Sequence, residues 1–246
     1  MWGWIREAAS AVWNGVRGLG NLVWQGLWWL VNTLVGLLDG LLTLLGIMPW
    51  KKIRVQGVVL LDEKRVPVAD RDDVQEVLEL AKEVLAKEIK VRLSSPALRV
   101  TYVPEAAPSR VLEVGCDASI WGAQFTGVGG WFRSHQARRP SGTFFGYGSP
   151  VTVFVVRDVK GKRGCAPPGF LADYVVIDPR ALAGSEGSRL TLAHELGHAC
   201  NLLHGFPSSG RGTLMQSGGD DPGVRPRRMT RAQKAAFRGS PHVTYL

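Results

Sequence analysis

The chain has 246 residues, 45% of them hydrophobic, which is enough to bury the core of one full domain and to leave an appendage. Its formal net charge is +9 at pH 7, and basic residues crowd the C-terminal part. Such a surface can meet anionic lipid or acidic peptide, and a merely solvated face explains it equally well. Because no nucleic-acid-binding motif accompanies the charge, we expect no nucleic-acid partner.

Residues 1–50 differ in composition from everything that follows, and we treat them as a separate unit. Seven of the nine tryptophans lie there, and no charged residue occurs between Gly18 and Leu38. About 20 apolar residues span a bilayer as a helix, and tryptophan is enriched at membrane interfaces. We therefore predict a hydrophobic helical segment that associates with a membrane, either as a transmembrane helix or lying in the interface plane. A helix docked on the domain or on a partner is the alternative.

Residues 51–246 carry the alternating elements of a folded domain. Periodicity predicts an amphipathic helix over 71–90, with Asp70 as its N-cap. The stretch 115–150 is rich in glycine and aromatic residues and predicts mostly loop. A helix that carries the principal motif starts near Ser185 or Ser188, and a final helix starts at Thr230, which forms a capping box with Gln233. The predicted strands are 53–61, 98–103, 111–114, 151–156 and 174–177.

The chain contains three cysteines, and none of them forms a C-x-x-C pair that would indicate a second metal site. Cys200 is expected to be a buried packing residue. Cys116 and Cys165 can form a disulfide if the compartment is oxidising, but their pairing cannot be derived from the sequence.

The stretch from His194 to His204 reads H-E-x-x-H-x-x-N-x-x-H and contains three of the five histidines. On a helix, residues four apart share a face, so His194 and His198 can direct two imidazoles at one point. Neutral imidazole is a preferred Zn²⁺ ligand, and Glu195 stands where a carboxylate can take a proton from metal-bound water. His204 can be the third ligand if the helix ends and the chain turns. Asn201 suits that turn because asparagine tolerates the left-handed backbone conformation.

These residues resemble the metzincin clan of zinc metalloproteases, whose motif is H-E-x-x-H-x-x-G-x-x-H followed by a Met-turn. Asn201 replaces the glycine of that motif, and Thr213 to Ser217 is the candidate Met-turn. The resemblance implies that Met215 packs beneath the metal ligands without binding zinc. It also implies an α+β, zincin-like mixed sheet with an upstream helix, an active-site helix and a C-terminal helix, here preceded by the hydrophobic helical segment.

The expected activity is that of a membrane-associated zinc endopeptidase, with one catalytic Zn²⁺ and a peptide or protein substrate. A zinc-activated water would attack the peptide bond, with Glu195 as general base. Two alternatives stay open. One is a non-catalytic membrane-bound zinc protein that binds peptide, and the other is a zincin of another clan with a downstream Glu ligand.

The two indications of membrane orientation conflict. Lys51, Lys52 and Arg54 follow the hydrophobic segment, and the positive-inside rule would place this richer flank in the cytoplasm. The resemblance indicates the opposite, because most metzincins act outside the cytoplasm. We expect an extracytoplasmic catalytic domain tethered by residues 1–50.

Overall fold

The structure is a computed structural model. It describes residues 34, 36–94, 100–116, 127–137, 148–167, 173–204, 212–216 and 226–245. The uncharged stretch 18–38 therefore lies almost entirely outside the described residues, and Ser217 of the candidate Met-turn lies outside them too. Among the described residues, no helix has both the length and the apolar character needed to cross a membrane.

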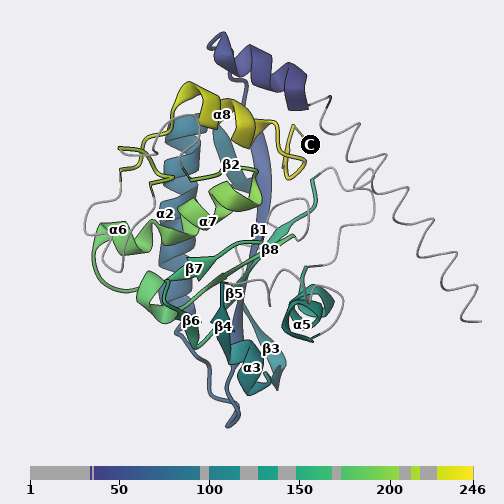
Figure 1. The fold of residues 1–246 in the computed structure, drawn as a ribbon, viewed down its shortest axis with the longest axis vertical. Coiled ribbons are helices and arrows are strands. Elements are labelled where there is room, and N and C mark those ends of the chain that lie inside the picture. Colours follow the sequence, from purple (N-terminus) through teal and green to yellow (C-terminus); the bar gives the residue numbers. More distant parts are fainter. Residues whose placement is uncertain are drawn as a thin grey trace, which may run out of the picture.

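The domain is a mixed α/β structure built on a mostly parallel sheet of order β2-β1-β5-β8-β7 (Figure 1). Its central strand is β1 (Lys51–Leu61), which pairs in parallel with β2 (Val91–Ser94), β3 (Thr101–Ala106) and β5 (Val151–Val155). Strand β8 (Tyr174–Ile177) continues the sheet in parallel with β5. The last strand on that side, β7 (Gly164–Cys165), is antiparallel to β8.

Successive side chains of a strand point to opposite faces of the sheet, so the strands contribute to two apolar layers, one on each face. Val153, Val155 and Ile177 pack with α2 (Arg71–Ile89) and α7 (Thr191–Ala199) on one face. Phe154 and Val176 pack on the opposite face with α3 (Ser109–Leu112) and α5 (Gly127–His135). Both faces are covered, which explains why β5 and β8 are buried at every position.

The remaining elements connect or close the sheet. A second, two-stranded sheet pairs β4 (Glu113–Gly115) with β6 (Asp158–Lys160). The 3₁₀ turn η2 (Pro179–Ala181) and the short helix α6 (Glu186–Arg189) lead from β8 into α7. Helix α8 (Arg231–Arg238) and β9 (Val243–Thr244) follow, and β9 pairs antiparallel with β1.

Several predicted elements form as the local sequence indicates. In α2, the side chain of Asp70 accepts a hydrogen bond from the backbone N–H of Asp72, and the helix ends at Lys90 with φ of 53°. In α8, Thr230 and Gln233 form the predicted capping box in both directions. These signals are local, so the sequence alone is sufficient to locate them.

The structure differs from two predictions between residues 109 and 137. The predicted strand 111–114 begins as a helical turn, in which Val111 donates a hydrogen bond to the carbonyl oxygen of Pro108, and only Glu113 starts a strand. The predicted loop 115–150 contains the helix α5. Phe132 is fully buried against Phe154 and Tyr174, and this packing outweighs the low helix propensity of the glycines in α5.

Candidate metal centre

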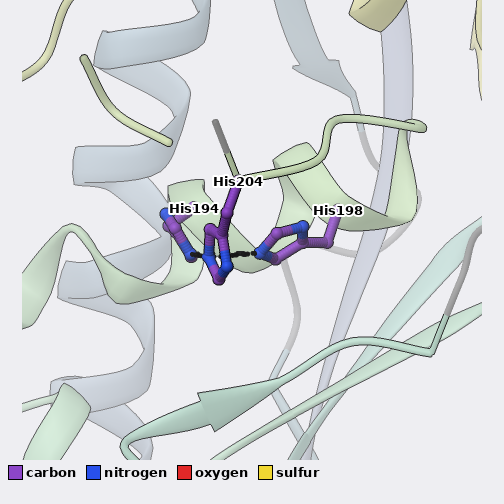
Figure 2. Close-up of side chains that lie close together, drawn as sticks. All are labelled: His194, His198 and His204. Carbon is purple, nitrogen blue, oxygen red and sulfur yellow. Dashed lines mark hydrogen bonds between the residues drawn. The ribbon is translucent and has the colours of Figure 1, made fainter. Parts of the chain in front are cut away.

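The three histidines of the motif come together at one point (Figure 2). His194 and His198 extend from one face of α7, and His204 reaches them from the chain that follows the helix. The Nε2 atom of His194 lies 2.9 Å from Nε2 of His204 and 3.1 Å from Nε2 of His198, and the third separation is 3.0 Å. The burial changes across the site, since His194 is buried, His198 is intermediate and His204 is exposed. The centre is therefore anchored in the core and open on one side.

Backbone carbonyl groups orient two of the three rings. Nδ1 of His194 lies 2.8 Å from the carbonyl oxygen of Leu214, and Nδ1 of His198 lies 2.7 Å from that of Leu202. A carbonyl oxygen only accepts hydrogen bonds, so each Nδ1 carries the proton, and a neutral ring then has its lone pair on Nε2. Lone pairs that face one another at about 3 Å need a cation between them. The arrangement therefore fits a metal ion, and the carbonyl groups are the outer partners that metal-binding histidines use.

The turn at Asn201 returns the chain to the metal centre. Asn201 has φ of 68°, in the left-handed region. At this turn the N–H of Asn201 donates to the carbonyl of His198, and the N–H of Leu202 donates to that of Gly197. The turn serves two ligands, because it directs the carbonyl of Leu202 to His198 and leads the chain on to His204.

Met215 packs against the helix that carries the ligands. It is fully buried, and a Cβ added to Gly197 would lie 2.5 Å from its Sδ. Glycine at position 197 thus leaves the space that the methionine fills. The preceding residue, Leu214, supplies the carbonyl oxygen that orients His194. The segment around Met215 consequently supports the site through packing and through one hydrogen bond.

Glu195 lies close to the edge strand of the sheet. Its relative exposure is 6%, and a Cβ added to Gly164 of β7 would lie 2.8 Å from its Cγ. The same Cβ would lie 2.9 Å from Cγ2 of Thr191. The backbone of β7 and the carboxylate arm of Glu195 can approach this closely only because residue 164 has no side chain.

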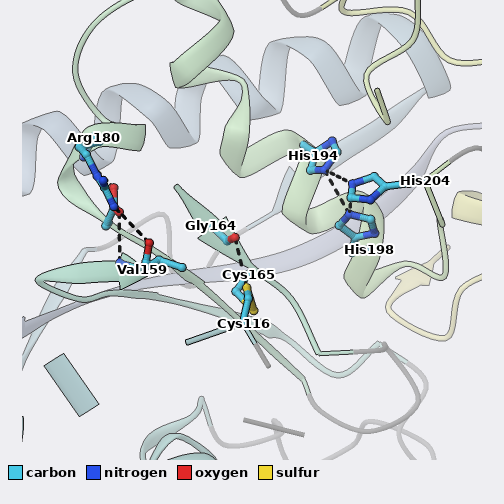
Figure 3. Close-up of a disulfide and its surroundings, with 9 residues drawn as sticks. Cys116, Val159, Gly164, Cys165, Arg180, His194, His198 and His204 are labelled. Carbon is cyan, nitrogen blue, oxygen red and sulfur yellow. Dashed lines mark hydrogen bonds and ion pairs between the residues drawn. A yellow bond between two sulfur atoms is a disulfide. The ribbon is translucent and has the colours of Figure 1, made fainter. Parts of the chain in front are cut away.

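A disulfide joins Cys116 and Cys165 beside the same strand (Figure 3). It connects the end of β4 to β7, and Sγ of Cys116 lies 3.5 Å from the carbonyl oxygen of Gly164. The sequence left this pairing open. Cys200 is separate, fully buried and not disulfide-bonded, and burial raises the pKa of its thiol to about 12.

The other two histidines have different surroundings. His135 stacks on Trp131, and its Nε2 lies 2.7 Å from Oε1 of Glu105. His242 is buried, with Nδ1 3.0 Å from the carbonyl oxygen of Ser149. Among the described residues, the three motif histidines are the group of potential ligand side chains arranged to hold a metal ion.

Sequence reasoning missed three contributors to the site: the carbonyls of Leu202 and Leu214, and Gly164. No local pattern marks them, because each acts through its backbone after the chain has folded. The role of Gly197 could have been predicted from the sequence. It lies inside the motif helix, where a glycine lowers helix stability unless close packing requires it.

The comparisons with known proteins add no family assignment. No protein-family model matches the chain, and no curated protein matches it either. The structure itself establishes a three-histidine group that can hold a metal ion, placed in a mixed α/β domain.

Proposed function

We propose that this chain is a membrane-associated, zinc-dependent endopeptidase with a zincin-like fold of the metzincin type. The observation that carries the proposal is the convergence of three Nε2 atoms within 3.1 Å of one another, with Glu195 adjacent in sequence to His194. Three imidazoles without a carboxylate form a ligand set that suits zinc, and such a set leaves a fourth position open. Zinc bound there supplies Lewis acidity and lowers the pKa of a coordinated water to about 7.

Glu195 is the proposed general base. It takes a proton from the attacking water and passes it to the leaving amine, a role that suits a carboxylate next to a metal ligand. An extended peptide that pairs with β7 would pass next to Glu195, because Gly164 of this edge strand packs against it. The substrate is therefore proposed to bind as an additional strand, held by backbone hydrogen bonds.

The arrangement of elements supports the zincin-like assignment. An upstream helix, α2, lies on the same face of the sheet as the helix that carries the ligands, α7. The segment around Met215 follows, and α8 completes the domain. This order is the one that the metzincin resemblance implies.

The proposed location is outside the cytoplasm, at a membrane. The disulfide between Cys116 and Cys165 supports this proposal, because disulfides persist in oxidising compartments. The tryptophan-rich, uncharged N-terminal sequence supports association with a bilayer.

The two alternatives differ in what they leave unexplained. A zincin with a downstream Glu ligand needs a glutamate after the motif, and the chain contains none beyond Glu195. A zinc protein that only binds peptide needs no carboxylate next to its ligands, so it leaves Glu195 without a role.

The test compares the wild-type chain with Glu195→Gln and His204→Ala, using zinc analysis and cleavage of a peptide library with and without a chelator. We expect one zinc per chain in the wild type and in Glu195→Gln, and much less in His204→Ala. Cleavage should fall by about 10²–10⁴-fold in Glu195→Gln, the usual contribution of general acid–base catalysis. Wild-type chain that holds zinc but cleaves nothing would favour the peptide-binding alternative. Undiminished cleavage by Glu195→Gln would reject the assigned base.

A further inference from the structure

The helical segment over residues 36–44, the purple helix at the top of Figure 1, has its polar and apolar sides reversed. Its inward side chains include Asp39 and Thr43, with relative exposures of 4% and 2%. Its outward face is apolar, and Leu38 and Leu45 expose 68% and 76% of their surfaces. A surface helix in water normally presents the opposite arrangement. The exposed apolar side chains of this segment are Leu37, Leu38, Leu41 and Leu44, and those of Leu45 and Ile47 follow directly after it.

The inward face is held against α8 by close backbone packing. A Cβ added to Gly36 would lie 2.2 Å from the carbonyl oxygen of Gly239, so glycine is required at this crossing. Gly40 lies one turn further along, and a Cβ added to it would lie 3.9 Å from the Cβ of Ala235. The two glycines, spaced four residues apart, thus pack against small residues within the same chain.

Charged groups fix the rotation of the segment about its own axis. Nζ of Lys51 lies 3.1 Å from Oδ2 of Asp39, and Nη2 of Arg238 lies 3.4 Å from Oδ1. The hydroxyl of Tyr245 also donates to Asp39, and Nε of Arg238 donates to Thr43 at 3.1 Å. Turning the leucines inward would break these buried contacts, so the apolar face stays directed outward.

A basic and aromatic group, here called the rim, lies at the first residues of β1 and β2, where the chain from this segment enters the sheet. The guanidinium of Arg92 lies 4.5 Å from the centre of the Trp50 ring. Lys52 is the register partner of Arg92 across β1 and β2, and both are exposed, as is Lys90. Tryptophan favours the headgroup level of a bilayer, and lysine and arginine are attracted to anionic headgroups.

We propose that the leucine face of residues 36–47 inserts into the surface of an anionic bilayer, with the rim of Trp50, Lys52, Lys90 and Arg92 against the headgroups. The positive charge of the rim favours lipid over a second copy of this chain, which would bring like charges together. In the sequence, the uncharged stretch from Gly18 leads directly into this helix. The bilayer then holds the catalytic domain in one orientation, because the contacts of Asp39 join the helix to the domain.

The inference rests on the proposed membrane association but not on hydrolysis, so cleavage assays and the following experiment fail independently. In the full-length chain, Leu38→Cys and Leu45→Cys are each labelled with an environment-sensitive fluorophore. Val66→Cys, an apolar site that is 54% exposed and lies beyond the other end of β1, is the matched control. Vesicles of phosphatidylcholine, with and without phosphatidylserine, carry brominated chains that quench a probe in the hydrocarbon. We expect quenching at residues 38 and 45 and none at 66.

The rim is tested by the double variant Lys52→Glu/Arg92→Glu against the control Lys64→Glu/Lys87→Glu, which has the same net charge. Each basic residue near an anionic surface contributes to the free energy of membrane binding. The loss of two such residues in Lys52→Glu/Arg92→Glu should weaken partitioning into the anionic vesicles by at least about 30-fold. The control should partition as wild type. Bound chain without quenching at residue 38 would show that a second copy or residues 1–33 cover the leucines. Chain that does not bind either vesicle would overturn the inference, as would equal partitioning of both double variants.

Discussion

Asn201 shows how one backbone conformation positions two of the candidate metal ligands. Its φ of 68° places it where asparagine is tolerated and a β-branched residue is an outlier. We expect Asn201→Gly to keep zinc affinity and peptide cleavage, and Asn201→Val to lose both, because a strained turn misdirects His204 and the carbonyl of Leu202. Zinc titration of the folded variants is the measurement. Equal zinc affinity in the valine variant would show that the turn does not position the third ligand.

Tyr174 carries a buried hydroxyl that has no hydrogen-bond partner within the described part of the chain. Tyr174→Phe removes this desolvated group and keeps the ring packed, so the free energy of unfolding should rise by about 1 kcal/mol. Denaturant titration at neutral pH measures the change. Tyr102→Phe, on an exposed ring, should change little. A large loss of stability in Tyr174→Phe would mean that the hydroxyl is bonded after all.

Tyr174 also leads to a prediction about stability at alkaline pH. Burial raises the pKa of Tyr174 from 10 to about 12. Between these two values the unfolded chain loses the phenol proton while the folded state keeps it. The free energy of unfolding therefore has its full value below pH 10 and falls as the pH rises through about 12. Stability should therefore fall less steeply between pH 10 and 12 in Tyr174→Phe than in wild type. Parallel curves for the two proteins would contradict the shifted pKa.

At the scale of elements, local sequence signals were sufficient to locate the longer helices and the buried strands. Caps and helical periodicity placed α2 and α8, and buried runs placed β5 and β8. Strand β7 has two residues and β9 has two, which is too short for any alternation to appear in the sequence. Each exists because a longer partner strand supplies its hydrogen bonds, and pairing over that distance along the chain is not a local property. The sequence therefore could not predict the edge strand beside Glu195, although it did predict Glu195 itself as a site residue.

The close approach of β7 to α7 makes Gly164→Ala a test of the edge strand. The added methyl would overlap Cγ of Glu195 and Cγ2 of Thr191, so the carboxylate or the strand must move. We expect zinc content to stay at the wild-type level and kcat/KM to fall by about 10²-fold, the usual consequence of misplacing a reacting group by about 1 Å. Lys162→Ala, an exposed substitution nearby, is the control. Cleavage at the wild-type rate by Gly164→Ala would show that β7 does not position Glu195.

At the scale of the whole molecule, Asp39 joins three parts of the chain. It lies in the helical segment 36–44, and its partners lie in β1, in α8 and at Tyr245, next to β9. The predicted boundary between residues 50 and 51 falls between Asp39 and these partners. Composition separates the two regions as sequences, but it does not reveal that the Asp39 carboxylate forms contacts on both sides of the predicted boundary.

Asp39→Ala should therefore destabilise the domain that follows it. The substitution leaves the ammonium of Lys51 and the guanidinium of Arg238 buried without their counterion, a situation that costs about 3–5 kcal/mol. Asp73→Ala, which removes an exposed carboxylate, is the control and should cost much less. Denaturant unfolding of the full-length chain measures both. A loss equal to that of the control would mean that the helix is not coupled to the domain.

The pH dependence of this loss identifies its cause. Burial lowers the pKa of Lys51 below 10.5, while Asp39 opposes the shift, so Asp39→Ala should lower that pKa further. For a group with a depressed pKa in the folded state, the full stability is present above the unfolded value and is lost as the pH falls through the folded value. The deficit of Asp39→Ala relative to wild type should thus be greatest near neutral pH and shrink toward pH 10.5, as Lys51 becomes neutral. It should not vanish, because Arg238 stays charged. A deficit that is constant over this range would assign the loss to packing rather than to buried charge.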